Sequence, residues 1–310
     1  MNRPPSTSLP KRVRIVDVGP RDGLQNEQAI VPTDVKVALI ERLADAGVRN
    51  VESTSFVSPK WVPQMADAAD VMARIRRKPG VVYSVLVPNM KGFEGALAAK
   101  ADEVVVFGAA SETFSQKNIN CSIAESIERF RPVVAAARAA GMHVRGAISC
   151  ALGCPYQGEV APEAVGYVAK LMRDIGVQHV GVADTIGVGT PAAVQRAMAA
   201  ALAVYPVADV SGHFHDTYGQ ALANVYACLE LGIATFDTSV TGLGGCPYAK
   251  GATGNVATED VVYMLHGLGI ETGIDLAKLR EAGRFIAAHL GRPTGSRAGR
   301  ALDMREGVGA

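Results

Sequence analysis

The chain has 310 residues, of which 48% are hydrophobic, and a nearly balanced charge of 31 Lys plus Arg against 30 Asp plus Glu. This length suffices for a large core and is the size of a single α/β barrel. Because there is no basic surplus, we expect neither nucleic acid nor an anionic membrane surface as a partner. No apolar run approaches the roughly 20 residues that a membrane-spanning helix needs.

The beginning of the chain and the cysteines indicate the type of protein. Residues 1–12 are polar and proline-rich, and we expect a flexible tail rather than a secretion signal. Five cysteines, at positions 121, 150, 154, 228 and 246, form an odd and sparse set. Such a set predicts reduced thiols and a cytoplasmic location rather than a disulfide framework.

Short β-branched segments alternate with longer amphipathic segments along the chain. The predicted strands are 13–18, 48–54, 81–87, 102–108, 143–149, 177–183, 208–215 and 234–240. Segments with helical spacing of apolar residues lie between them, for example 34–47, 65–77, 123–141, 163–176 and 219–232. The strands begin about every 31 residues, which is close to the length of one βα unit.

Eight such units predict a (β/α)₈ TIM barrel, which we expect to span residues 13–290 as one catalytic domain. An open doubly wound sheet would normally carry a glycine-rich phosphate turn after its first strand, but the turn here is GPRDGLQNE, residues 19–27. From about residue 272 we expect an additional C-terminal helix on the outside of the barrel. Residues 291–310 are expected to form a polar tail.

Polar residues gather at the C-terminal ends of the predicted strands, where barrels of this kind carry their active sites. They are Arg21, Asp22, Glu52, Asp184, His213 and His215. His213 and His215 are two apart on one strand, so both imidazoles face the same side. The alternative for this pair is two hydrogen-bonded core histidines.

Closure of a barrel would bring the histidines close to other potential metal ligands. Strand one becomes the neighbour of strand eight, so Asp22 and Asn255 can converge with His213 and His215. This mixed nitrogen and oxygen set suits a divalent ion such as Mg²⁺, Mn²⁺, Co²⁺ or Zn²⁺. We therefore predict a metal site with positions left for a substrate.

The remaining polar residues at the strand ends have less specific patterns. Arg21 is either a surface ion-pair partner or a cation that stabilises charge on a carbonyl oxygen. Glu52 is expected to orient Arg21 or a metal ligand, and the pattern defines no role for Asp184. Residues 108–126 are expected to form a long loop with Lys117, suitable as a wall for the substrate.

Several long motifs resemble the 3-hydroxy-3-methylglutaryl-CoA lyase family, which belongs to a metal-dependent barrel superfamily with isopropylmalate and homocitrate synthases. The motifs include VDVGPRDGLQNE, VESTSFVSPKWVPQMAD, HDTYGQALAN and GLGGCPYAKGATGN. Together with similar segments they cover most of residues 13–290. This extent is far more specific than the two histidines alone.

The resemblance implies roles for individual residues and a divalent metal cofactor, Mg²⁺ or Mn²⁺. Asp22, His213 and His215 match metal ligands, and Asn255 matches a close or fourth ligand. Arg21 matches the arginine at the thioester carbonyl, and Cys246 matches a reactive cysteine. Glu52 and Asp184 match supporting acidic residues, and Glu259 matches a glutamate near the loop. Glycines around Cys246 suggest that residues 242–255 form a lid that carries this proton donor over the site.

The reaction implied by the resemblance is cleavage of an acyl-CoA thioester, 3-hydroxy-3-methylglutaryl-CoA, to acetoacetate and acetyl-CoA, with Asp22 or His213 as the base. Ala147 stands where other members carry tyrosine, so a longer-branched 3-hydroxyglutaryl-CoA or citramalyl-CoA is an alternative substrate. A Claisen synthase and a non-catalytic CoA-binding or metal-binding relative are further alternatives. We expect a homo-oligomer, either a dimer or a tetramer.

Overall fold

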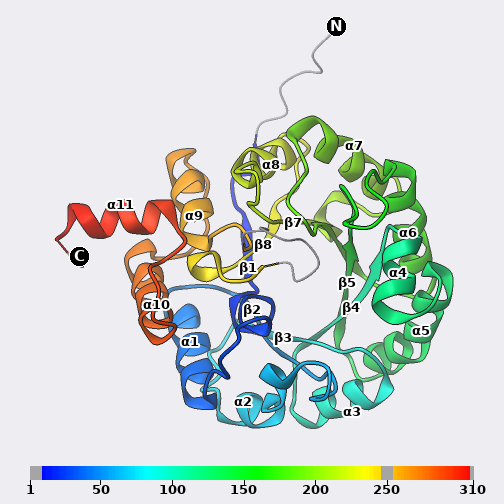
Figure 1. Cartoon of the computed structure of the whole chain (residues 1–310), viewed down its shortest axis with the longest axis horizontal. Helices are drawn as coiled ribbons and strands as arrows, with labels where there is room; N and C mark the ends of the chain where they lie inside the picture. The colour runs from blue at the N-terminus through cyan, green and yellow to red at the C-terminus, as the bar shows by residue number, and fades with distance from the viewer. Residues whose placement is uncertain (1–8, 246–253, 308–310) are drawn as a thin grey trace, which may run out of the picture.

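Eight parallel strands close into a barrel in which every strand pairs with its neighbours in the chain and β8 returns to β1 (Figure 1). This computed structural model describes residues 9–245 and 254–307. The strands are β1 Arg14–Asp17, β2 Asn50–Ser55, β3 Val82–Leu86, β4 Glu103–Ala109, β5 His143–Ser149, β6 His179–Asp184, β7 Val210–Phe214 and β8 Thr235–Thr238. The predicted (β/α)₈ barrel is confirmed.

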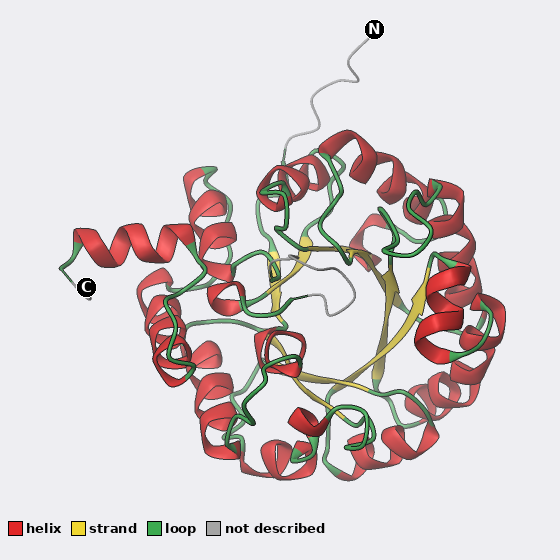
Figure 2. Cartoon of the chain, in the orientation of Figure 1, coloured by secondary structure: helices red, strands yellow, loops and turns green. Residues whose placement is uncertain are grey.

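A ring of helices surrounds the strands (Figure 2). The helices are α1 Thr33–Asp45, α2 Ala68–Arg74, α3 Met90–Ala98, α4 Glu112–Ile119, α5 Ile123–Ala139, α6 Pro162–Asp174, α7 Pro191–Leu202, α8 Ala221–Leu229, α9 Thr258–Gly267, α10 Leu276–His289 and α11 Arg297–Arg305. No helix in these two described ranges is long and apolar enough to cross a membrane.

The main hydrophobic core lies between the strands and the helices. On β5, Val144 and Ile148 are fully buried in this core. Arg145 follows Val144 and faces the opposite side of the strand, towards the barrel interior. Its guanidinium donates a hydrogen bond to Asp237 of β8 across the barrel. Alternation along each strand therefore separates an apolar outer layer from a barrel interior that contains charged side chains.

Two segments differ from their predicted conformation. Residues 297–305 of the predicted tail form α11. Ser296 precedes this helix as its N-cap, and its hydroxyl accepts a hydrogen bond from Gly299 N. Arg280 of α10 pairs with Asp303 of α11 and with Glu306, the residue after α11, so tertiary ion pairs stabilise a helix with little apolar content. Figure 1 shows α11 extending outwards beside α9 and α10.

The segment after β4 is also more ordered than predicted. Within the expected loop of residues 108–126, Glu112–Ile119 form α4, and the Ser111 hydroxyl accepts a hydrogen bond from Phe114 N. Asn120 then ends the helix in a left-handed conformation. Of the expected N-terminal tail, residues 1–8 lie outside the described part of the chain.

Candidate active site

Asp22 and Arg21 are held by a tight turn that follows β1. The chain forms a single π-helical turn over Gly19–Gly23, and Gly19 N donates a hydrogen bond of 2.8 Å to Asp17 Oδ1. A side chain at Gly19 would place its Cβ only 2.8 Å from that carboxylate oxygen. The sequence GPRDG therefore allows a close approach that fixes where the following arginine and aspartate lie.

The two histidines come from the end of β7. Their ring centroids are 5.6 Å apart with the planes tilted by 39°, as expected for side chains on one face of a strand. Beyond β7, the backbone of His215 pairs with Asn255, because Val256 N donates to Phe214 O and Asp216 N donates to Gly254 O. This pairing brings Asn255 beside His215, although they are 40 positions apart.

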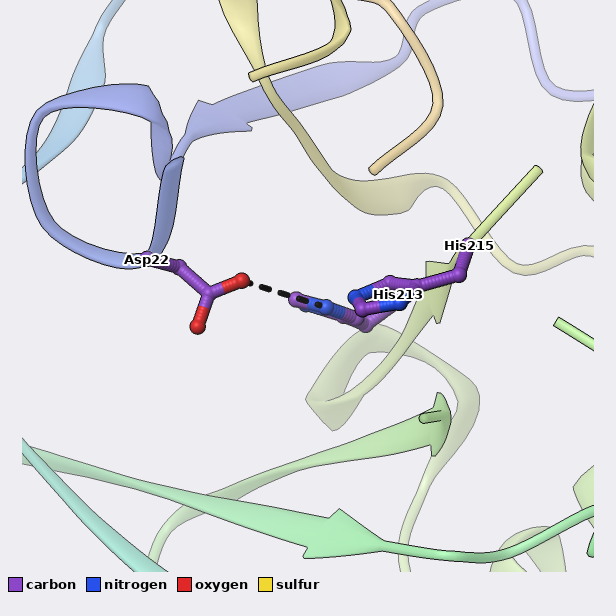
Figure 3. Close-up of side chains that lie close together, drawn as sticks. All are labelled: Asp22, His213 and His215. Atoms are coloured by element: carbon purple, nitrogen blue, oxygen red, sulfur yellow. Dashed lines mark ion pairs between the residues drawn. The ribbon is translucent and has the colours of Figure 1, made fainter. Parts of the chain in front are cut away.

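Asp22, His213 and His215 form a cluster whose potential ligand atoms all lie within 4.8 Å of one another. His213 Nε2 is 4.0 Å from Asp22 Oδ2. Figure 3 shows the Asp22 carboxylate, from the turn after β1, facing the two imidazoles. The predicted convergence of these three residues is observed.

Unsatisfied polar atoms at this cluster fit a bound cation. Asn255 donates its amide to Asp22 Oδ2 at 2.9 Å and to Leu243 O at 3.1 Å. Its Oδ1 is buried without a hydrogen-bond partner among the described residues, and so is His215 Nδ1. Buried polar atoms of this kind are costly unless something satisfies them. A divalent ion accepts both oxygen and imidazole ligands, so the donor set suits one.

The electrostatics keep Asp22 and His215 in the protonation states that a metal requires. Burial alone would raise the pKa of Asp22, but the positive charge of Arg21 and the two imidazoles outweigh it and lower the pKa to about 2. Burial, together with His213, lowers the pKa of His215 to about 4. At neutral pH the cluster therefore offers an ionised carboxylate and a neutral imidazole from His215.

Arg21 is clamped between two carboxylates. Its Nε donates to Glu52 Oε1 at 2.5 Å, and its Nη1 donates to Asp22 Oδ1 at 2.7 Å. Glu52 is buried on β2, and Arg21 is itself almost fully buried. Burial alone would lower the pKa of Arg21, but its two carboxylate partners outweigh that effect and raise the pKa. The predicted orienting contact of Glu52 on Arg21 is present in the structure.

Asp184 is directed to a loop rather than to the cluster. At the end of β6, its carboxylate accepts hydrogen bonds from Val188 N and Gly189 N, at 3.1 and 2.7 Å. A Cβ at Gly189 would lie 2.8 Å from Asp184 Oδ2. Burial raises the pKa of Asp184 to about 6 against these backbone hydrogen bonds. These contacts indicate that Asp184 stabilises the turn before α7.

Cys246 and Glu259, the two residues predicted at or near the glycine-rich segment, have different outcomes. Cys246 lies outside the described residues, as does most of the predicted lid. Glu259, on α9, is buried, and both of its carboxylate oxygens accept from Thr241 N, at 3.1 and 2.9 Å. Thr241 is one of the non-glycine residues with positive φ, at 55°. Glu259 therefore fixes the backbone just before the glycines.

The sequence interpretation missed Asp237 and Arg145. Asp237 Oδ2 lies 3.4 Å from His213 Nδ1, and Asp237 Oδ1 lies 2.7 Å from Arg145 Nη2. Both residues are buried in the barrel interior. Period-two alternation would have assigned them to inward positions, because Arg145 and Asp237 each occupy the middle of a strand. Their contact with each other depends on barrel closure, which the strand pattern alone does not resolve.

Comparisons with known proteins agree with this geometry. A model of the HMGL-like family matches residues 12–286. The mitochondrial hydroxymethylglutaryl-CoA lyase of Rattus norvegicus is 60% identical over 294 residues, which are 95% of this chain and 90% of that protein. A 3-hydroxy-3-isohexenylglutaryl-CoA/hydroxy-methylglutaryl-CoA lyase of Pseudomonas aeruginosa is 58% identical over 295 residues, or 95% and 98% of the two chains.

A solved structure supports the same relationship in three dimensions. The crystal structure of hydroxymethylglutaryl-CoA lyase from Pseudomonas aeruginosa superposes with a TM-score of 0.94 at 57% identity, covering 96% of this chain and all of that one. The sequence matches and the shared barrel extend over nearly the whole chain. The protein is therefore a member of the HMGL-like family.

Proposed function

We propose that the protein is a carbon–carbon lyase that cleaves (S)-3-hydroxy-3-methylglutaryl-CoA to acetoacetate and acetyl-CoA with a divalent metal, Mg²⁺ or Mn²⁺. The observation that carries the proposal is the position of Arg21 beside the cluster of Asp22, His213 and His215. A cation for developing negative charge and a ligand set for a metal then lie at one site. Relatives that are 56–60% identical over most of the chain carry the name of this activity.

The metal would be held by Asp22, His213 and His215, with Asn255 Oδ1 as a further oxygen donor. When bound, a divalent ion supplies Lewis acidity that polarises oxygen atoms of the substrate. Asn255 also donates its amide to Asp22 and so orients that ligand. The protein residues thereby fix where the hydroxyl and carboxylate of the substrate lie.

The bond cleavage needs a base, a site for negative charge and an acid. The hydroxyl proton on C3 leaves to Asp22, and a carbonyl forms at C3 as the C2–C3 bond breaks. The electron pair moves to C2 and the thioester oxygen, where Arg21 stabilises it. A proton delivered to C2 then completes acetyl-CoA, and we assign this donor to Cys246 on the resemblance alone.

The direct test is release of acetoacetate from purified protein supplied with 3-hydroxy-3-methylglutaryl-CoA and Mg²⁺ or Mn²⁺. We expect turnover that is lost on chelation and restored by the metal. A metal-loaded, folded protein that releases no acetoacetate would overturn the assignment. The same assay separates an enzyme from a non-catalytic relative, and adding a 2-oxo acid with acetyl-CoA would reveal a synthase.

A broader acyl specificity is a second candidate, supported by the wall of the barrel beside the metal ligands. Ala147 shares the inner face of β5 with Arg145, pairs with Gly181 of β6, and is partly exposed. Ala183 of β6 pairs in turn with His213. The side chains between the metal ligand and β5 are therefore small, which leaves room for a longer substituent on C3.

The test of this second candidate is Ala147→Tyr. A bulky side chain should lower kcat/KM for a thioester with a long branch at C3 by at least about tenfold, since a lost or blocked apolar pocket is worth roughly 1–3 kcal/mol. The methyl-branched substrate should be affected less. Equal losses for both substrates, or no activity of the original protein on the long-branched one, would contradict it. Ala135→Tyr, at an exposed position of α5, is the control for bulk alone.

A further inference from the structure

A buried aspartate approaches the second nitrogen of His213. Asp22 lies near Nε2, at 4.0 Å, whereas Asp237 Oδ2 lies near Nδ1, at 3.4 Å. The two nitrogens are on different edges of the imidazole ring. Asp237 of β8 therefore contacts the histidine from within the barrel, and Asp22 contacts it from the side where the candidate metal ligands meet.

The other oxygen of Asp237 is occupied by Arg145. Arg145 Nη2 donates to Asp237 Oδ1 at 2.7 Å and lies 3.4 Å from Ser211 Oγ. Arg145 is 3% exposed, so this guanidinium and Asp237 are paired in a buried environment. An arginine cannot lose its proton under these conditions, and its charge keeps the carboxylate ionised. The aspartate therefore acts only as an acceptor.

An acceptor at this position determines which nitrogen of His213 carries the proton. In a neutral imidazole one nitrogen has the hydrogen and the other has the free lone pair. Asp237 Oδ2 forms a hydrogen bond with Nδ1 only when the proton is on Nδ1. The lone pair is then on Nε2, which faces Asp22 and the cluster. The opposite tautomer would set a lone pair against a carboxylate and turn an N–H towards the metal ligands.

We propose that Asp237 and Arg145 are a pair of positioning residues that hold the proton of His213 on Nδ1 and so present Nε2 to the metal. This inference rests on the metal site of the proposed function, but the tautomer itself exists without metal or substrate. Asp237 fixes the tautomer and the ring orientation, and Arg145 fixes Asp237. Neither residue touches the reacting atoms.

The informative variant is Asp237→Asn, which keeps the shape of the side chain. Its single carbonyl oxygen is drawn to Arg145, so its NH₂ group faces His213 Nδ1 and selects the tautomer with the proton on Nε2. The serine protease triad gives the same switch when its aspartate is replaced by asparagine. We expect Mn²⁺ affinity to fall 10–100-fold, the usual effect of losing such an orienting partner.

Against the effect of its burial, Asp237 and Asp22 raise the pKa of His213. The primary measurement is therefore the tautomer of His213 in metal-free protein labelled with ¹⁵N-histidine, by long-range ¹H–¹⁵N correlation at a pH at which the ring is neutral. The chain has six histidines, so His213→Ala identifies the signal. The proposal expects a proton on Nδ1 in the original protein and on Nε2 in Asp237→Asn, together with weaker Mn²⁺ binding by calorimetry. A proton on Nε2 in the original protein would overturn it, and that spectrum requires no variant at Asp237 to fold.

Glu103→Gln is the matched control. Glu103 Oε1 lies 3.9 Å from Arg145 Nη1, and the substitution removes the same charge from the same barrel interior. It leaves the contact between Asp237 and His213 in place, so the tautomer and the Mn²⁺ affinity should not change. Equal losses of affinity in both variants would show that interior charge, rather than the tautomer, matters, and would overturn the proposal. Absence of lyase activity with the expected tautomer would instead count against the proposed function alone.

Discussion

At the scale of single residues, the site depends on side chains that are fixed from two sides. Arg21 is held by Glu52 and Asp22, and Asp22 is held by Arg21 and Asn255. Each contact is between charged or amide groups with little exposure to water, where hydrogen bonds to charged groups are stronger and more directional. Removing one member should therefore affect chemistry more than the number of lost contacts suggests.

Replacement of Arg21 by Met tests its role at the thioester oxygen. Loss of a donor for developing charge should lower kcat by about 10²–10³, which corresponds to roughly 3–4 kcal/mol. Metal content, measured by Mn²⁺ titration, should stay near the original stoichiometry because Asp22 and both histidines remain. Steady-state kinetics with an unchanged kcat would remove Arg21 from the mechanism.

Replacement of His215 by Ala tests the ligand set. One of the two imidazole ligands is lost, so bound Mn²⁺ should fall well below one ion per chain after dialysis, and activity should fall with it. Metal analysis and calorimetry measure this directly. His266→Ala, an exposed histidine on α9 that contacts Thr272, should retain both properties. Full metal occupancy in His215→Ala would refute the assignment of this ligand.

At the scale of elements, the first turn of α9 joins the segments that carry the site. The Thr258 hydroxyl donates to Asp17 Oδ2 at 2.7 Å and contacts Thr238 Oγ1 of β8, also at 2.7 Å. Glu259 binds Thr241 N, and Asp260 accepts from Ser296 and Ala298 at the start of α11. This turn thereby fixes the backbone after β1, the backbone after β8 and the C-terminal helix.

Thr258→Val should weaken this connection without changing the size of the side chain. The buried Asp17 carboxylate would lose a donor, which typically costs about 1–3 kcal/mol. Urea unfolding should show that loss, and kcat should also decrease because the turn that carries Arg21 is less well fixed. Thr33→Val, which removes a hydroxyl contact to Asp67 far from the site, should cost less and leave kcat unchanged. Equal effects in the two variants would contradict the prediction.

At the scale of the whole molecule, two buried acids couple stability to pH. Burial raises the pKa of Glu259 from 4.5 to about 8 and that of Asp17 from 3.8 to about 7, against the hydrogen bonds that each accepts. The native state therefore retains protons that the unfolded chain has released. Both groups contribute stability that is complete below their unfolded pKa and is lost as pH rises through the native pKa.

Glu259→Gln tests this coupling with a neutral side chain of the same shape. Between about pH 5 and pH 8, the free energy of unfolding of the original protein should fall relative to the variant, by up to about 1.4 kcal/mol per pH unit. Above pH 8 the difference should be constant. Urea unfolding at several pH values measures it, and parallel curves for the two proteins would show that Glu259 does not take up a proton on folding.

The sequence by itself determined the barrel, because alternation of β-branched and amphipathic segments at a period near one βα unit is a local pattern. It also placed Asp22, His213 and His215 together, since strand ends in a barrel share one rim. Contacts in the folded state determined the conformation of segments whose local pattern did not predict it. α11 forms because Arg280 pairs with Asp303 and Glu306. The start of α4 is different, because its N-cap Ser111 is a local signal that the loop prediction for residues 108–126 did not use.

The contact of Asp237 with His213 is the clearest case of a decision made only by tertiary structure. The sequence shows an aspartate and a histidine 24 positions apart in different strands, and the pattern of neither strand reveals that the two side chains are in contact. Their contact depends on the register of β7 with β8, which pairs them as neighbours. Asn255 depends likewise on the pairing of the chain beyond β7. Sequence spacing places a side chain on a strand and on one of its faces. Strand register and barrel closure, which are long-range properties, then determine which other side chains it contacts.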